Sequence, residues 1–232
     1  MSEAKRVLMI VTSHARLGES DAPTGFWLEE LAAPYGVFRD AGLAIDIASP
    51  SGGRPPADPK SEKSDAEPVR RFLEDREAMA KLESTLRLAD VTDRYDAYFI
   101  VGGHGVMWDL AQSPEVAALL GPAHDAGKVV AAVCHGPAAL VGVRDAKGEP
   151  IVRGRRVAAF SNEEEDAVGL TSVVPFPLET RLRELGASYE RGPKWGAFAV
   201  RDGNLVTGQN PQSSADTARE VLAALGVAAS RT

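Results

Sequence analysis

Short, almost continuous apolar segments alternate along the chain with amphipathic segments. The apolar segments are RVLMIVT, AIDIAS, AYFIVG and KVVAAV, at residues 6–12, 44–49, 97–102 and 128–133. Strands that are apolar on both faces are typical of parallel sheets, because helices cover both faces of such a sheet. The pattern therefore predicts an α/β domain in which a mostly parallel sheet lies between two layers of helices.

Amphipathic helices are predicted between and after these strands. Four side chains after the first strand recur at helical spacing: Leu31, Pro34, Tyr35 and Phe38. Residues 114–128 read as a helix that ends near Gly127, and residues 214–226 begin with Ser and end with Gly, as amphipathic helices often do. These helices supply the layers that the apolar strands require.

The C-terminal third departs from strict alternation. Residues 156–161, RVAAFS, predict a further strand, and residues 197–208 place an Asp-Gly pair between two apolar runs. An Asp-Gly pair in that setting is the usual signal of a β-hairpin. The sheet is therefore expected to be mixed, with an antiparallel hairpin at its C-terminal end.

One segment does not fit the minimal alternating pattern. Residues 49–68 are rich in Pro, Gly, Ser and charge, and the sequence leaves open whether they form a solvated loop or a lid over a pocket. Residues 69–91 predict a helix outside the core sheet. We therefore expect a small, lid-like insertion at about residues 49–90 within a single domain of residues 1–232.

Composition narrows the classes of function. The net charge of −7 argues against nucleic acid as a partner, because such binding requires a basic surface. No apolar run is long enough to cross a bilayer, and the first residues, MSEAKRVLMIVTSH, predict a strand and not a secretion signal. The single cysteine cannot form an internal disulfide. A soluble, cytoplasmic protein without a membrane or nucleic-acid partner is expected.

The single cysteine, Cys134, directly follows the predicted strand at residues 128–133. It is either a buried apolar residue or a nucleophile on a sharp turn, since Gly136 and a predicted helix at residues 137–143 follow it. A helix amino-terminus would lower the pKa of the thiol. His135 would then be a proton carrier beside the sulfur.

A second loop, VGGHGVMWDL at residues 101–110, follows another predicted strand. Gly102 and Gly103 could direct backbone N–H groups at an anion, as in an oxyanion hole, or simply form a tight turn. Trp108 in this loop, together with Trp27, could wall a small pocket or belong to the core.

The titratable residues offer one further candidate. Glu29 is expected to be solvated, whereas Glu30 lies beside Leu31 of the apolar stripe and could be a buried, protonated carboxyl or a general base. The histidines lack the paired spacing of zinc or iron sites, so no metal is expected. They are His14, His104, His124 and His135.

The motifs VGGHG and AAVCHGPAAL and the segment from Glu30 to Pro34 resemble the DJ-1/PfpI superfamily. Together with the insertion, they are most similar to its Hsp31-like branch of glutathione-independent glyoxalases (glyoxalase III). The similarity runs from about residue 5 to residue 226. It implies a flavodoxin-like fold that is also related to class I glutamine amidotransferases.

The resemblance also implies roles for individual residues. Cys134 matches the nucleophile, His135 the histidine that follows it, and Glu30 the acidic residue that touches the sulfur. FSNEEEDAVGL supplies Glu165 as the carboxylate that orients the histidine, and two of the three residues at 163–165 are expected at the surface.

The same resemblance places substrate-binding groups in the two loops. The N–H groups of Gly103 and His135 would hold the oxyanion. Gly102 and Trp108 would complete the binding side of the site.

The implied activity is conversion of methylglyoxal and other 2-oxoaldehydes to 2-hydroxy acids such as lactate, through a cysteine hemithioacetal and without a cofactor. A homodimer is expected. The alternatives are a protein or nucleotide deglycase, a stress chaperone and a cysteine oxidation sensor. Amidotransferase activity is excluded, because those enzymes use a histidine well after the cysteine and no histidine follows His135.

Overall fold

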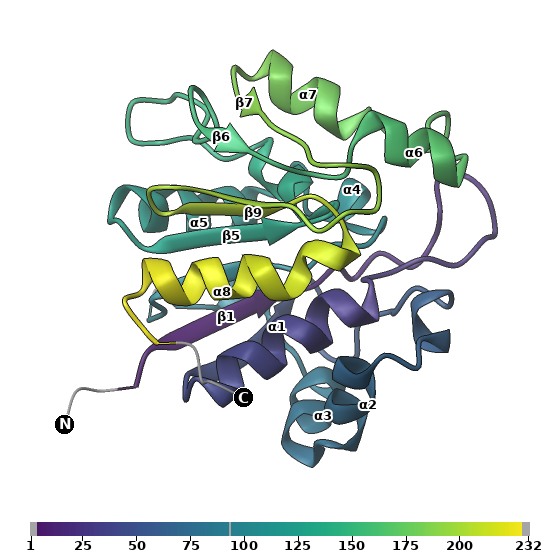
Figure 1. The fold of residues 1–232 in the computed structure, drawn as a ribbon, viewed down its shortest axis with the longest axis vertical. Helices are drawn as coiled ribbons and strands as arrows, with labels where there is room; N and C mark the ends of the chain where they lie inside the picture. The colour runs from purple at the N-terminus through teal and green to yellow at the C-terminus, as the bar shows by residue number, and fades with distance from the viewer. Residues whose placement is uncertain (1–3, 93, 229–232) are drawn as a thin grey trace.

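Seven strands form the main sheet, in the order β3-β2-β1-β4-β5-β9-β8 (Figure 1). This computed structural model describes residues 4–92 and 94–228. The strands are β1 Arg6–Ile10, β2 Ala44–Ser49, β3 Leu86–Arg87, β4 Ala97–Ile100, β5 Val129–Val133, β8 Ala199–Asp202 and β9 Leu205–Gly208. Neighbouring strands are parallel except for β8 and β9, which confirms the mostly parallel sheet with an antiparallel C-terminal hairpin.

Helices cover both faces of this sheet. They are α1 Leu28–Asp40, α2 Glu67–Glu74, α3 Arg76–Glu83, α4 Val106–Asp109, α5 Pro114–Asp125, α6 Asn162–Val168, α7 Leu178–Glu184 and α8 Ser214–Ala224. Figure 1 shows α1 and α8 in front of the sheet and α5 behind it. Successive residues of β1 point to opposite faces of the sheet. Val7 and Met9 pack in the core on the side of α1 and α8, and Leu8 and Ile10 pack in the core on the side of α5.

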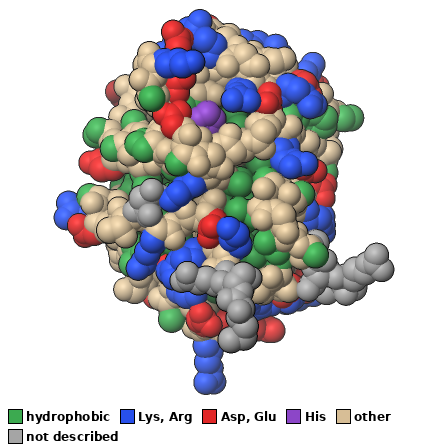
Figure 2. Space-filling model, turned by 90° about the vertical axis from the view of Figure 1, so that its left-hand side faces the viewer, with side chains coloured by type: hydrophobic (Ala, Val, Ile, Leu, Met, Phe, Trp, Pro, Cys, Tyr) green, Lys and Arg blue, Asp and Glu red, His purple; other side chains and the backbone are tan. Residues whose placement is uncertain are grey.

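The face of the molecule shown in Figure 2 is mixed in charge. Figure 2 shows the side from which the parallel strands start, where Lys and Arg side chains are interspersed with Asp and Glu. Within residues 4–92 and 94–228, no helix combines the length and the apolar character that crossing a bilayer requires.

Three predicted elements differ from the structure. The predicted strand at residues 156–161 is reduced to β6 Arg156–Val157, which pairs with β7 Ser188–Tyr189 outside the main sheet. It ends there because Ala158 N–H donates to Thr207 Oγ1 and Phe160 N–H donates to the Cys134 carbonyl. Both donors are therefore unavailable to a strand ladder.

The predicted helix at residues 69–91 is instead α2 and α3, followed by β3. The break falls at Asp75, whose side chain accepts hydrogen bonds from the N–H groups of Glu77 and Ala78 and so caps α3. Residues 137–143, predicted as a helix, contain a short 3₁₀ helix, η3 Gly136–Leu140.

The insertion at residues 49–90 braces the start of α1. Phe26 N–H donates to the Pro56 carbonyl, and Asp58 N–H donates to the Phe26 carbonyl. Ser61 Oγ accepts from Leu28 N–H, which is one of the free donors at the start of the helix. The insertion therefore stabilises the start of α1 and contributes no residue to the cavity described next.

Candidate active site

The carboxyl ends of the central strands carry a cavity of about 220 Å³. Ligands of open α/β sheets bind at this edge, where the strand order reverses. The loop after β4, the turn after β5 and the first turn of α1 meet here. The cavity is lined by Trp27, Glu29, Glu30, Gly103, His104, Cys134, His135, Phe160, Val168, Trp195, Pro211 and Gln212.

Cys134 forms the sharp turn that the sequence suggested. Its φ of +59° lies in the left-handed region, which costs a non-glycine residue about 1–3 kcal/mol. Its N–H donates to the Gly208 carbonyl at 2.9 Å, and its carbonyl accepts from Phe160 N–H at 2.8 Å. Neighbouring segments therefore hold the strained turn on both sides, and the thiol lines the cavity.

A chain of hydrogen bonds runs from the thiol to a buried carboxylate. His135 Nδ1 lies 3.4 Å from Cys134 Sγ, and His135 Nε2 lies 2.7 Å from Glu165 Oε2. The second carboxylate oxygen, Oε1, lies 2.8 Å from His104 Nε2. Glu165 thus holds two histidine rings, whose centroids are 4.0 Å apart.

The electrostatics of this chain define its protonation. Burial and the neighbouring His104 lower the pKa of His135 to about 4, so the imidazole is neutral at neutral pH. Burial alone would raise the pKa of Glu165, but the two histidines lower it below its usual value. An ionised Glu165 accepts a hydrogen bond from Nε2–H of His135, which leaves Nδ1 unprotonated and free to accept the thiol proton.

The Cys134 thiol is neutral at rest. Burial, followed by the effect of the nearby Glu30 carboxyl, raises the pKa of the thiol well above its usual value. The prediction that a helix amino-terminus lowers this pKa is therefore wrong, since the element that follows is the short η3 and burial dominates. The sulfur must transfer its proton as it reacts.

Glu30 is the second unusual carboxyl of the site. It is completely buried, and neither of its oxygens makes a well-formed hydrogen bond among the described residues, although the Cys134 thiol and the Gly102 N–H lie close by. Burial raises the pKa of Glu30 well above the ordinary value, although the Cys134 thiol and the Gly102 N–H partly oppose the shift. A carboxyl kept protonated beside a reactive sulfur can donate and recover a proton.

The raised pKa of Glu30 predicts a pH dependence of stability. Folded Glu30 keeps its proton above the ordinary pKa of 4.5, where the unfolded chain releases it, so stability falls as the pH rises from 4.5 towards the folded-state pKa. Urea unfolding between pH 5 and pH 9 should show a smaller loss of stability for Glu30→Gln than for the wild type. Parallel curves would contradict an elevated pKa in the folded protein.

Gly102 and Gly103 allow close packing around the site, because they have no Cβ atom. A Cβ atom on Gly102 would lie 2.3 Å from a Glu30 carboxyl oxygen, and one on Gly103 would lie 2.4 Å from the Gly25 carbonyl. Gly103 also has a φ of +103°. Among the described residues, no backbone carbonyl accepts from the N–H groups of Gly103 and His135, and the His135 N–H lies near the Cys134 sulfur, where it partly opposes the raised pKa of the thiol.

Trp108, predicted to bind substrate, lies elsewhere. It belongs to α4, stacks on His14 with ring centroids 5.1 Å apart, and lines a different cavity of about 270 Å³. Trp27 does line the cavity at Cys134, and so does Glu29. Glu29 is half-buried, whereas the sequence predicted that it is solvated.

The three glutamates at 163–165 also differ from the prediction. Only Glu163 is exposed, where it pairs with Arg191. Glu164 is buried and accepts hydrogen bonds from Ser161, Gln209 and other donors around it. A single acidic run thus supplies a surface charge, a structural carboxylate and the orienting Glu165, a division that follows from the helical turn and not from the composition.

Six residues of the cavity lining were not identified as site residues from the sequence: His104, Phe160, Val168, Trp195, Pro211 and Gln212. His104 was noted only as one of four scattered histidines, yet it meets His135 because the loops after β4 and β5 are neighbours. The ligand atoms of His104, His135 and Glu165 lie within 4.8 Å of one another, a spacing that could hold a metal ion. An ion there would have to displace both histidine–carboxylate hydrogen bonds.

His104 is expected to act through Glu165. Its loss removes one of the two charge-assisted hydrogen bonds that fix the carboxylate, which should lower kcat by about tenfold and leave KM nearly unchanged. Steady-state kinetics of His104→Ala measure this effect, with His14→Ala as the control, because His14 stacks on Trp108 and does not line the cavity at Cys134. Unchanged kcat would show that Glu165 needs no second partner.

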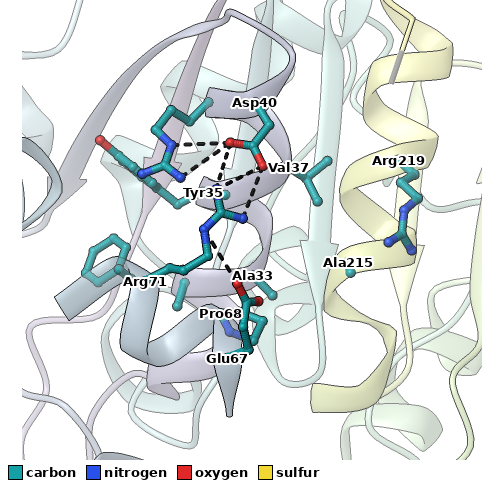
Figure 3. A pocket seen from close by; sticks show the side chains of 13 residues that line it. Ala33, Tyr35, Val37, Asp40, Glu67, Pro68, Arg71, Ala215 and Arg219 are labelled. Atoms are coloured by element: carbon teal, nitrogen blue, oxygen red, sulfur yellow. Dashed lines mark hydrogen bonds and ion pairs between the residues drawn. The ribbon is translucent and has the colours of Figure 1, made fainter. Parts of the chain in front are cut away.

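Another cavity, of about 370 Å³, lies between α1, α2 and α8 (Figure 3). Figure 3 shows Arg71 between Asp40 and Glu67, with N–O distances of 3.0 and 3.6 Å. Its described lining contains no cysteine or histidine. The paired charges and the lack of a nucleophile distinguish this cavity from the one at Cys134.

Comparison with known proteins identifies the family of the chain. The model of the DJ-1/PfpI family matches residues 22–224, and the chain belongs to this family. It is 34% identical to glyoxalase 3 of Candida albicans, over 94% of this chain and 98% of that protein. It is 30% identical to the glutathione-independent glyoxalase HSP31 of Saccharomyces cerevisiae, over 95% of this chain and 98% of that protein.

Structural similarity extends to the same relatives. The crystal structure of glyoxalase III from Candida albicans superimposes with a TM-score of 0.88 at 31% identity, covering 95% of this chain and 97% of that chain. The branch inferred from the sequence motifs is therefore confirmed.

Proposed function

We propose that the protein is a glutathione-independent glyoxalase that converts 2-oxoaldehydes such as methylglyoxal to 2-hydroxy acids such as lactate, a lyase of the glyoxalase III type. The observation that carries this proposal is the chain Cys134–His135–Glu165 beside the protonated Glu30 in one small cavity. The names of the similar proteins support it.

The first step forms a bond between Cys134 Sγ and the aldehyde carbon. The thiol proton passes to Nδ1 of His135 as the bond forms, and the resulting imidazolium is stabilised by Glu165. The former aldehyde oxygen becomes the oxyanion of a hemithioacetal, held by the Gly103 and His135 N–H groups. This oxygen then takes the proton from the His135 imidazolium, which restores a neutral imidazole that can act as a base.

The second step moves a proton between adjacent carbons. A base removes the proton from the hemithioacetal carbon, and an enediol forms as the neighbouring ketone oxygen is protonated. Protonation of the second carbon, with loss of the hydroxyl proton on the first carbon, then gives a 2-hydroxyacyl thioester on Cys134. Glu30 and His135 are the groups within reach of the sulfur for these transfers.

Hydrolysis completes the reaction. Water attacks the thioester carbonyl, the 2-hydroxy acid leaves, and the sulfur recovers its proton. The aldehyde carbon is oxidised and the ketone carbon is reduced, so the balance is one 2-oxoaldehyde plus one water to one 2-hydroxy acid. Every step uses side chains of this protein and water.

Burial makes oxidation sensing a weaker alternative. Sensor cysteines are accessible thiolates, whereas Cys134 is 4% exposed and burial raises the pKa of its thiol. Deglycase activity would use the same cysteine, and release of aldehyde followed by glyoxalase turnover would account for it.

The proposal is tested by incubating the purified protein with methylglyoxal in D2O without glutathione. Lactate should form as a single enantiomer on chiral chromatography, and deuterium should appear at C2 if the transferred proton exchanges with solvent. If thiol titration shows that Cys134 is unmodified and no lactate forms, the proposal is overturned.

A further inference from the structure

Two residues with side chains have a positive φ in the described part of the chain, and both line the cavity at Cys134. They are Cys134 itself, at +59°, and Trp195, at +61°. Such a backbone conformation is unfavourable for a residue with a Cβ and persists only where its surroundings enforce it. At Cys134 the strained backbone positions the nucleophile in the cavity. A role in the same cavity is therefore expected for the strained backbone at Trp195.

The backbone of Trp195 is fixed by the buried carboxylate of Glu164. Trp195 N–H donates to Glu164 Oε1 at 3.0 Å, and the same oxygen accepts from Gln209 Nε2 at 3.0 Å and Asn210 Nδ2 at 2.8 Å. These contacts join the loop of Trp195 to the segment that precedes α8. The backbone that carries the indole is therefore fixed by a buried polar network.

The indole itself remains 38% exposed despite this support. Val168, which also lines the cavity, is likewise 38% exposed. Exposed apolar side chains around a concave site are typical of a binding surface, since they contribute little to the core. The network around Glu164 thus positions an apolar surface that the fold does not use.

The cavity is larger and more apolar than a three-carbon substrate requires. Its volume is about 220 Å³, whereas an apolar cavity of about 150 Å³ accommodates a benzene ring. The rings of Phe160 and Trp195 lie 5.8 Å apart, and Trp27 and Val168 add further apolar surface. No Lys or Arg is among the described lining residues, and Glu29 disfavours an anionic substituent.

We propose that Trp195 is a specificity-determining residue, which with Phe160 and Val168 binds the substituent of neutral 2-oxoaldehydes that carry an aromatic or branched apolar group. This inference rests on the proposed glyoxalase function. Phenylglyoxal is the probe of this substrate class. Its conversion to mandelate follows the same balance as methylglyoxal to lactate, one aldehyde plus one water, with the same bond to Cys134.

The test compares kcat/KM for phenylglyoxal and methylglyoxal. In the wild type we expect phenylglyoxal to be preferred by about tenfold or more, because apolar groups bound in a fitted pocket discriminate by about that factor. Trp195→Gly removes the indole and tolerates a positive φ, so the loop can be retained. It should lower the ratio by about tenfold, and Trp195→Phe should restore most of it.

Leu73→Ala is the matched control, because Leu73 is an exposed apolar residue outside the cavity. A wild-type preference for methylglyoxal, or an unchanged ratio in Trp195→Gly, would overturn the inference. Calorimetric binding of 1-phenyl-1,2-propanedione, which has no aldehyde proton to transfer, separates the two proposals. Binding that is lost in Trp195→Gly, without turnover of either aldehyde, would contradict glyoxalase function and support the apolar site; no binding and no turnover would contradict both.

Discussion

Cys134→Ser is expected to lose methylglyoxal turnover by about a thousandfold or more. A serine hydroxyl is a far weaker nucleophile than a thiol at neutral pH, and an ester is hydrolysed less readily than a thioester. The substitution removes little volume, so the strained turn and the thermal midpoint should be nearly preserved. Chromatographic measurement of lactate, without glutathione, gives the two rates.

The same variant separates the alternative functions. Suppression of aggregation of a denatured client protein should survive Cys134→Ser if the protein is a chaperone, whereas turnover and aldehyde-dependent protection should not. Mass spectrometry of acid-quenched wild type should show an adduct with the mass of methylglyoxal on the peptide that contains Cys134. Lactate formation by the variant within tenfold of the wild type would contradict covalent catalysis.

Glu165→Gln is expected to lower kcat/KM by about a hundredfold or more. An amide carries no charge to stabilise the imidazolium of His135, and an NH2 group facing Nε2 would favour the tautomer with the proton on Nδ1. That tautomer cannot accept the thiol proton. Rates between pH 4 and pH 9 measure the loss, which should appear at every pH.

The pH profile of the wild type gives an independent check. His135 must be neutral to act as a base and its pKa is about 4, so on the acid side activity should persist until the pH falls towards that value. Glu163→Gln is the matched control, because Glu163 is exposed and adjacent in sequence. Equal activity of Glu165→Gln and Glu163→Gln would show that the carboxylate is not needed.

The sheet could be predicted because its strands are buried on both faces. Parallel strands such as β1 and β5 need apolar residues at consecutive positions, and that pattern is visible without knowledge of their neighbours. β6 could not be delimited in the same way, since its end depends on the Thr207 hydroxyl and the Cys134 carbonyl. Those partners become neighbours only in the folded chain.

The candidate site shows the same difference between features set by local sequence and features set by distant segments. Residues fixed by local geometry, such as Cys134 after its strand and Gly103 in its loop, were found from the sequence and its resemblance to a family. Trp108 was misplaced because a turn of helix directs it away from the cavity, and spacing from a glycine loop does not reveal that rotation. His104 and Trp195 reach the site through contacts between distant segments.

The insertion at residues 49–90 leaves and rejoins the molecule at one place. Gly53 and Thr85 form a β-bridge, and β3 then pairs with β2 at the edge of the main sheet. An appendage with such closely spaced ends can be gained or lost during evolution without rethreading the core. Because Ser61 caps α1 from this appendage, a homologue that lacks it must secure the first turn of that helix, and with it the acidic residue beside the cysteine, by other means.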